Sequence, residues 1–214
     1  MSESWRTITV AAPRLAGWVA RFAERHGPPQ ARVVATTVTL TSPDQAEARL
    51  WLRWEDTLDS ADPVSSLVAA ALRPRRLGLL LVRRERHALG IWDQGLVCSR
   101  TGRHHVQGRT KAGGWSQQRY ARRREQQARQ AFADAATDAA VILEPEVTGL
   151  EAVLLAGDSA GLDAVLADRR CTALADLVRS RATARLEIRE PNRDALVDLV
   201  TRYNAALVEL NQYA

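Results

Sequence analysis

The chain has 214 residues, of which 46% are hydrophobic and 26% charged, so it can bury a core, and disorder over its whole length is excluded. No apolar run reaches the roughly 18 residues of a membrane span, and the N-terminus lacks a signal-peptide pattern, so we expect a cytoplasmic protein without a membrane partner. The net charge of +5 is unevenly distributed, because residues 100–129 hold nine basic residues and one acidic residue. This segment therefore carries +8 and the rest of the chain −3, which is typical of a surface that binds a polyanion.

The first half of the chain reads as strands and two short helices. Pro13 suits the first turn of a helix, and Asp62-Pro63 suits the start of another. Gly102 separates the last two strands of a meander. The pattern predicts a strand over 7–10, a helix over 13–25, a hairpin of strands 31–40 and 46–54, a helix from 62 to 72, and strands over 77–82, 87–92, 95–99 and 103–107.

The second half alternates helices and strands. Ser116 is the expected N-cap of a long basic helix over 117–136. The remaining pattern predicts a strand over 150–155, helices over 159–167 and 172–180, a strand over 184–188 and a terminal helix over 193–210. No linker divides the chain, so the sequence predicts a single α/β domain over 1–214, with a mixed β-sheet flanked by helices.

Nothing in the sequence predicts a metal or a cofactor. Cys98 and Cys171 are far apart and lack the spacing of a zinc site, so we expect both to be small buried hydrophobes. His104 and His105 are adjacent on a predicted strand, where neighbouring side chains face opposite sides and cannot easily share an ion.

The residues most suited to chemistry lie in and after a loop over 108–118, which we expect to be mobile because it is rich in glycine. The helix that follows points its free N–H groups and positive dipole end at an anion ahead of it. Trp115 either stacks on a base or anchors the loop to the body. Candidates for binding RNA phosphates are Arg109, Lys111, Arg119, Arg122, Arg123 and Arg124, of which Arg119, Arg122 and Arg123 share one helix face.

The segment 106–127 resembles the catalytic loop of the Vms-like release factors, in particular their actinobacterial-type branch. That family is related to the central domain of archaeal and eukaryotic class-one release factors, which has an RNase H-like fold. The resemblance is looser at 13–27 and at 151–158. It implies a fold similar to that central domain over the whole chain.

The resemblance also implies a reaction. In the wider superfamily a Gly-Gly-Gln tripeptide enters the peptidyl-transferase centre, where the glutamine places water on the ester that joins peptide to tRNA. Vms-like members have G-x-x-Q, which maps here onto residues 114–117. It therefore implies catalytic roles for Gly113, Gly114 and Gln117, with Gln118 as a competing candidate. A glutamine amide and backbone N–H groups can orient water without a metal or a titrating residue.

The implied function is codon-independent rescue, in which peptidyl-tRNA is hydrolysed on stalled ribosomes or on large subunits. Its partners would be the rRNA of the large subunit and peptidyl-tRNA, with no DNA. We expect no codon-reading domain, zinc-finger module or repeat module in this chain, in agreement with this function. The alternative from a different class is a ribosome-binding or RNA-binding module that docks with the same helix and has no catalytic activity.

Two enzymatic alternatives follow from other residues. The segment 157–161 matches the G-x-S-x-G motif of α/β-hydrolases, but all four histidines precede Ser159, so the glycines fit better with a tight strand-to-helix turn. An RNase H-like nuclease would need carboxylates that converge on Mg2+, for which Asp93, Asp158 and Glu187 are the candidates near predicted strand ends.

Overall fold

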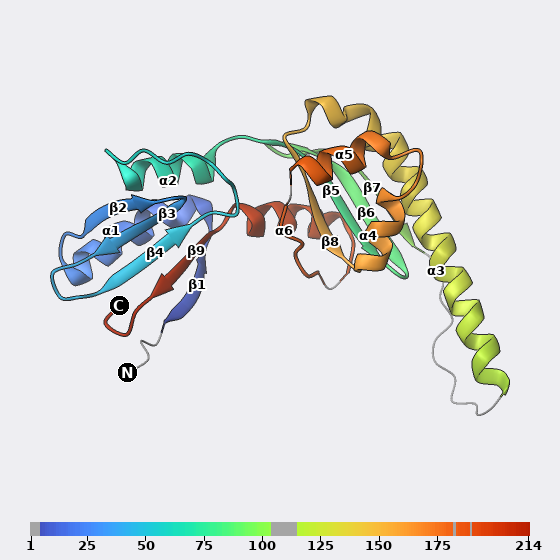
Figure 1. Cartoon of the computed structure of the whole chain (residues 1–214), viewed down its shortest axis with the longest axis horizontal. Coiled ribbons are helices and arrows are strands. Elements are labelled where there is room, and N and C mark those ends of the chain that lie inside the picture. The colour runs from blue at the N-terminus through green and yellow to red at the C-terminus, as the bar shows by residue number, and fades with distance from the viewer. Residues whose placement is uncertain (1–4, 104–114, 182, 189) are drawn as a thin grey trace. The chain divides into compact units, whose positions relative to one another are not determined.

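The structure is a computed structural model that describes residues 5–103, 115–181, 183–188 and 190–214 (Figure 1). For residues 115–121, 123 and 124 it describes the backbone. The described chain divides into two compact units. The first runs up to Arg73 and resumes at Val200, and the second runs from Pro74 to Leu199. Each unit contains one β-sheet.

The first unit holds a five-stranded antiparallel sheet in the order β1-β9-β4-β3-β2. Val38, Leu50 and Val208 lie side by side on three neighbouring strands and are fully buried, which defines the core face of the sheet. The strands are β1 (Arg6–Val10), β2 (Gln30–Val34), β3 (Thr37–Thr41), β4 (Glu47–Trp51) and β9 (Ala206–Leu210).

Two helices belong to the first unit. A short 3-10 turn, η1 (Ala12–Arg14), leads into α1 (Leu15–His26), and α2 (Pro63–Leu72) follows the strands. The carboxylate of Asp62 accepts a hydrogen bond from the backbone N–H of Ser65 at 3.2 Å, which caps α2 and confirms its predicted start.

The second unit holds a four-stranded mixed sheet in the order β7-β6-β5-β8, in which only β5 and β8 are parallel. β5 is buried from Leu77 to Val82, so both of its faces are covered, and it has a neighbouring strand on each edge. The strands are β5 (Arg76–Arg83), β6 (Arg86–Asp93), β7 (Leu96–Arg103) and β8 (Ala152–Gly157).

Helices α3, α4 and α5 pack on this sheet or on one another, whereas α6 runs across the boundary between the two units at residues 199 and 200. The longest, α3, has 28 residues, and its C-terminal half lies against β6 and α4. The elements are α3 (Trp115–Ile142), the 3-10 segment η2 (Glu144–Gly149), α4 (Ser159–Leu166), α5 (Thr172–Ser180) and α6 (Arg193–Asn204).

Several predicted boundaries are wrong in ways that have a physical reason. Residues 31–40 form two strands rather than one, since the chain reverses at Ala35, which adopts a positive φ of 54°. Gly102 does not separate two strands but lies inside β7, where it packs against the His87 ring. The part of the predicted strand 103–107 beyond Arg103 lies outside the described residues.

Three further differences concern the second half. α3 begins at Trp115, so Ser116 lies within the helix rather than capping it, and the helix runs to Ile142. The predicted strand 184–188 is reduced to one bridge, between Ala156 and Leu186. The predicted helix 193–210 ends at Asn204, and the chain continues as β9, which pairs with β1 and β4.

The predicted α/β class with helix-flanked β-sheet is confirmed. The strands form two sheets, one antiparallel and one mixed, where the sequence predicts one mixed sheet. The assignment of 1–214 to a single domain stays a prediction.

Candidate functional site: the α3 arm and its supports

The predicted site falls largely outside the described part of the chain. The described part does not include Arg109, Lys111, Gly113 and Gly114. The mobility of the loop up to residue 114 therefore stays a prediction. The backbones of Trp115, Gln117, Gln118, Arg119, Arg123 and Arg124 are placed in the first turns of α3. Arg122 is exposed on the same helix. The structure therefore places Gln117 in the first turn of a long helix, where backbone N–H groups have no partner within the helix.

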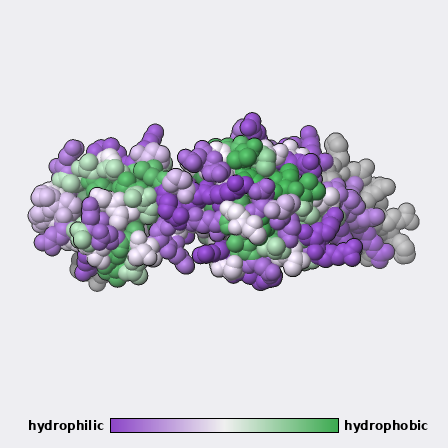
Figure 2. Space-filling view, turned by 90° about the horizontal axis from the view of Figure 1, so that it is seen from above, coloured by the Kyte–Doolittle hydropathy of each residue, from purple (hydrophilic) through white to green (hydrophobic). Residues whose placement is uncertain are grey.

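Helix α3 has two halves of different character. Its first half carries exposed polar side chains, among them Arg122, Glu125 and Arg129, and buried residues begin only at Ala131. The part that adjoins the grey residues presents a hydrophilic surface (Figure 2). At 1.5 Å per residue the 28-residue helix is about 42 Å long. In Figure 1 its N-terminal half extends beyond the sheet of its own unit, so we call it the α3 arm.

The root of the α3 arm is packed with small side chains. Ala131, Ala135, Ala136 and Ala139 are buried with exposed fractions of at most 3%, and they face the sheet and the helices beside it. Four alanines on one face let the helix approach its neighbours closely. The close approach leaves little freedom for the helix to tilt on the sheet.

An ion-pair network joins α3 to the strands that lead into the loop. Asp138 on α3 bonds with Nε2 of His87 on β6 and with Nη1 of Arg100 on β7, at 2.8 Å each. The His87 side chain is 2% exposed. Burial raises the pKa of the Asp138 carboxyl, but the hydrogen bonds from Arg100 and His87 outweigh it and hold this pKa below its ordinary value. The carboxylate therefore stays charged and ties α3 to two strands.

Gly102 makes this network possible. A Cβ atom at Gly102 would lie 2.1 Å from Cε1 of His87, so any other residue would displace the ring. The glycine lies directly before Arg103, the last residue of β7. The segment that enters the predicted loop is thus fixed against the same histidine that holds α3.

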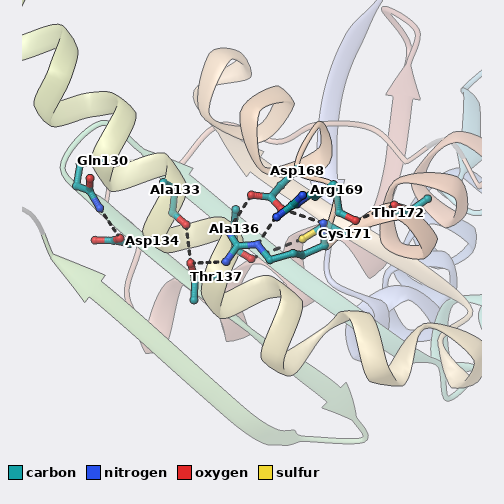
Figure 3. Close-up of polar contacts among 10 residues, drawn as sticks. Gln130, Ala133, Asp134, Ala136, Thr137, Asp168, Arg169, Cys171 and Thr172 are labelled. Atoms are coloured by element: carbon teal, nitrogen blue, oxygen red, sulfur yellow. Dashed lines mark hydrogen bonds and ion pairs between the residues drawn. The ribbon is translucent and has the colours of Figure 1, made fainter.

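A second set of contacts fastens α3 to the connection between α4 and α5 (Figure 3). Arg170 donates to Oγ1 of Thr137 at 3.1 Å and is itself held by Asp168 at 2.8 Å. The thiol of Cys171 contacts the carbonyl oxygen of Ala136 at 3.6 Å. Burial raises the pKa of this thiol to about 11. Cys171 is fully buried as predicted, whereas Cys98 is exposed, so the prediction for Cys98 is wrong.

The G-x-S-x-G segment is accounted for by packing, as its sequence indicates. Gly157 has a φ of 106°, and a Cβ there would lie 2.1 Å from the carbonyl oxygen of Val82. A Cβ on Gly161 would lie 2.8 Å from the Phe132 ring on α3. Asp158 occupies the N-cap position of α4, but its carboxylate accepts from the backbone N–H of Arg84 at 3.2 Å instead of capping the helix.

A groove of about 870 Å³ lies beside this turn, between α3 and the ends of β5 and β8. Its charged residues nearly cancel. Arg129 pairs with Glu125 at 2.6 Å, and Arg83 lies 3.6 Å from Asp158. A groove with matched charges is a poor polyanion site, so the strong basic character of this unit belongs to the α3 arm itself.

Asp93 and Asp158, two of the carboxylates suggested for a nuclease, do not converge. Asp93 is paired with Arg76 at the start of β5, whereas Asp158 follows β8 at the other end of the same strand. The length of β5 between these ends is about 20 Å. Among the described residues no cluster of three or more His, Cys, Asp or Glu is arranged to hold a metal ion. None of the described helices is long and apolar enough to cross a membrane.

A compact α/β unit with one long helix whose first half carries exposed charged side chains defines the class of protein. Within it, the chain belongs to the Actinobacteria/chloroflexi VLRF1 release factor family, whose model matches residues 75–209. This confirms the predicted family. Among solved structures, the archaeal translation termination factor aRF1 is similar, with a TM-score of 0.44 and 10% identity over 94% of this chain and 68% of that chain. The comparison with curated proteins gave no match.

Family membership makes this chain a release-factor protein and implies contact with the ribosome. The matched region contains the whole α3 arm and all of its supports. Sequence reasoning missed the supports His87, Arg100 and Asp138, because they are separated by up to 51 residues and meet only in the fold. No local motif marks them.

Proposed function

We propose that this chain is a cytoplasmic ribosome-rescue factor that hydrolyses peptidyl-tRNA without reading a codon. The observation that carries the proposal is the position of Gln117 in the first turn of the α3 arm, three residues after Gly114 in the G-x-x-Q spacing, within a release-factor family member. The arm would carry the glutamine into the peptidyl-transferase centre of a stalled ribosome or a large subunit.

In the proposed reaction a water molecule attacks the carbonyl carbon of the ester that joins the peptide to the tRNA. The bond from this carbon to the 3′ oxygen of the tRNA breaks, the oxygen leaves as a hydroxyl with a proton from the water, and the peptide is released as an acid. The Gln117 amide would orient the water, and free N–H groups at the start of α3 would stabilise the developing oxyanion. Gly113 and Gly114 would give the loop its conformation.

RNA binding is assigned to the basic residues around that position. In this proposal the rRNA and tRNA backbones are bound by Arg109, Lys111, Arg119, Arg122, Arg123 and Arg124, with Trp115 on a base. The exposure of Arg122 and the hydrophilic surface of the arm support it (Figure 2). The alternative, a docking module without catalysis, uses the same arginines and differs only in the role of Gln117.

The test is release of a labelled nascent peptide from stalled ribosome–peptidyl-tRNA complexes. We expect Gln117→Ala to lower the single-turnover rate by about 100-fold or more, as loss of one oriented donor does elsewhere. Gln118→Ala, one residue along the same helix turn, is the matched control and should retain release. Both variants should co-sediment with large subunits. If the unmodified protein binds subunits but releases no peptide, the docking module replaces the hydrolase.

A further inference from the structure

A second candidate site lies in the first unit, in a groove between α1 and the strands β1 and β9. Its volume is about 540 Å³, which is enough to take a nucleotide-sized group. The inner wall is apolar, with Ile8 on β1 and Leu210 on β9 next to the rings of Trp18 and Phe22 on α1. The family model matches residues 75–209, so none of the residues that line this groove falls within the matched region.

The two rings form a flat wall. The centroids of Trp18 and Phe22 are 5.6 Å apart and their planes differ by 21°, so they are stacked. Phe22 is 6% exposed, whereas Trp18 is partly exposed in the groove. A partly exposed indole supported from behind by a second ring is a platform on which a planar base can stack.

The rim of the groove is basic. Arg6, Arg21 and Arg25 lie around it and outnumber its one acidic side chain, Glu24, so the charged side chains sum to +2 beside the backbone of the last residue, Ala214. The remaining titratable side chain, His26, is bonded to Asp44 at 2.8 Å. Arg21 and Arg25 are four residues apart on α1 and so stand one above the other on the same helix face.

These three arginines differ from others in the same unit. Arg49 pairs with Glu47 at 2.9 Å and Arg73 with Asp56 at 3.0 Å. In the described part of the chain, no carboxylate forms an ion pair with Arg6, Arg21 or Arg25. Guanidinium groups grouped around a cavity without acidic partners are available to bind an anion from outside.

We propose that this groove binds single-stranded RNA, with one base stacked on Trp18 and the flanking phosphates bound by Arg21 and Arg25. Stacked rings beside arginines on one helix face fit the alternation of bases and phosphates in a single strand. An acidic peptide would satisfy the charge but would not need a flat aromatic wall. The choice of RNA rests on the proposed function, because a protein that acts on the ribosome is surrounded by RNA. The groove would give the protein a second RNA contact, separate from the α3 arm.

The experiment measures binding of a fluorescein-labelled ten-nucleotide poly(U) to the full-length chain by anisotropy. Arg122, Arg123 and Arg124 are changed to Ala throughout, so that the proposed contacts of the α3 arm do not mask the groove. We expect the added pair Arg21→Ala and Arg25→Ala to weaken binding at least about tenfold. A plot of the logarithm of the association constant against the logarithm of the salt concentration has a negative slope. The two substitutions should make this slope shallower by about 1.4, or about 0.7 for each lost phosphate contact.

The stacking contact has its own variant. Trp18→Leu keeps an apolar side chain against Phe22 but removes the indole, and it should weaken binding about tenfold. Arg32→Ala is the matched control, because Arg32 is an exposed arginine on β2 in the same unit and does not line the groove. It should bind as the parent does. Circular dichroism of each variant checks that the fold is retained.

Two outcomes overturn the proposal. One is that the parent does not bind poly(U), or that the variant with Arg21→Ala and Arg25→Ala and the variant with Trp18→Leu bind it as strongly as the parent does. The other is preferential binding of polyglutamate that depends on Arg21 and Arg25 but not on Trp18, which would assign the groove to an acidic peptide. Neither outcome bears on peptide release by Gln117, and loss of release in Gln117→Ala with intact poly(U) binding would leave both proposals standing.

Discussion

At the scale of single residues, the backbone of Gly157 decides how β8 passes into α4. Its φ of 106° is strained for any side chain, and a Cβ would lie 2.1 Å from the Val82 carbonyl oxygen. We expect Gly157→Ala to lower the free energy of unfolding by roughly 3 kcal/mol. Gly95→Ala is the control, because a Cβ there meets nothing within 4 Å, and it should change stability by less than about 0.5 kcal/mol. Urea unfolding of the two variants measures the difference, and equal stabilities would contradict the packing role of Gly157.

The two cysteines should react at very different rates. Cys98 is exposed, whereas Cys171 is fully buried and burial raises its pKa to about 11, so at pH 8 only about a thousandth of Cys171 is thiolate. In the native protein we expect a thiol reagent to modify one cysteine rapidly, and the second only after denaturation. Cys98→Ser should abolish the rapid phase. Rapid reaction of two thiols in the native protein would show that the contact between α3 and the α4–α5 connection opens readily.

At the scale of elements, Asp138 holds the root of the α3 arm to β6 and β7. Replacing it by Asn removes the charge that His87 and Arg100 share, and we expect a loss of about 2 kcal/mol in the free energy of unfolding. Peptide release should fall as well, because the arm and the strand that enters the loop lose their common anchor. Asp134→Asn, one turn earlier on the same helix, is the matched variant, since Asp134 accepts a hydrogen bond from Gln130 of that helix at 2.9 Å. Equal effects of the two substitutions would argue against the anchor.

The contribution of Asp138 should depend on pH in one direction. Its pKa in the folded protein lies below the ordinary carboxyl value, so the stabilisation is complete above that ordinary value and is lost as the pH falls through the folded pKa. The stability difference between the unmodified protein and Asp138→Asn should therefore shrink in acid. Unfolding curves at neutral pH and at pH values below 4 test this. A difference that stays constant would mean that the carboxylate is not protonated there or does not carry the stabilisation.

At the scale of the whole molecule, the C-terminal strand completes the sheet of the first unit. β9 lies between β1 and β4, and Ala206, Val208 and Leu210 are buried. Truncation after Ala205 removes an interior strand, so we expect the amides of β1 and β4 to lose protection from hydrogen exchange. The amides of β5, β6 and β8, which belong to the other unit, should stay protected. Loss of protection in both units would show that they unfold as one.

The sequence by itself determined the local features whose causes are local. The Asp62-Pro63 start of α2, the Gly157 turn, the basic helix and the release-factor family follow from residue types at fixed spacing. The tertiary structure decided what depends on partners distant in the chain. Residues 206–210 have an apolar pattern that fits a helix end as well as a strand, and pairing with β1 and β4 made them β9. The network of His87, Arg100 and Asp138 and the groove at Trp18 likewise exist only after folding, because side-chain partners dozens of residues apart leave no periodic signal in the sequence.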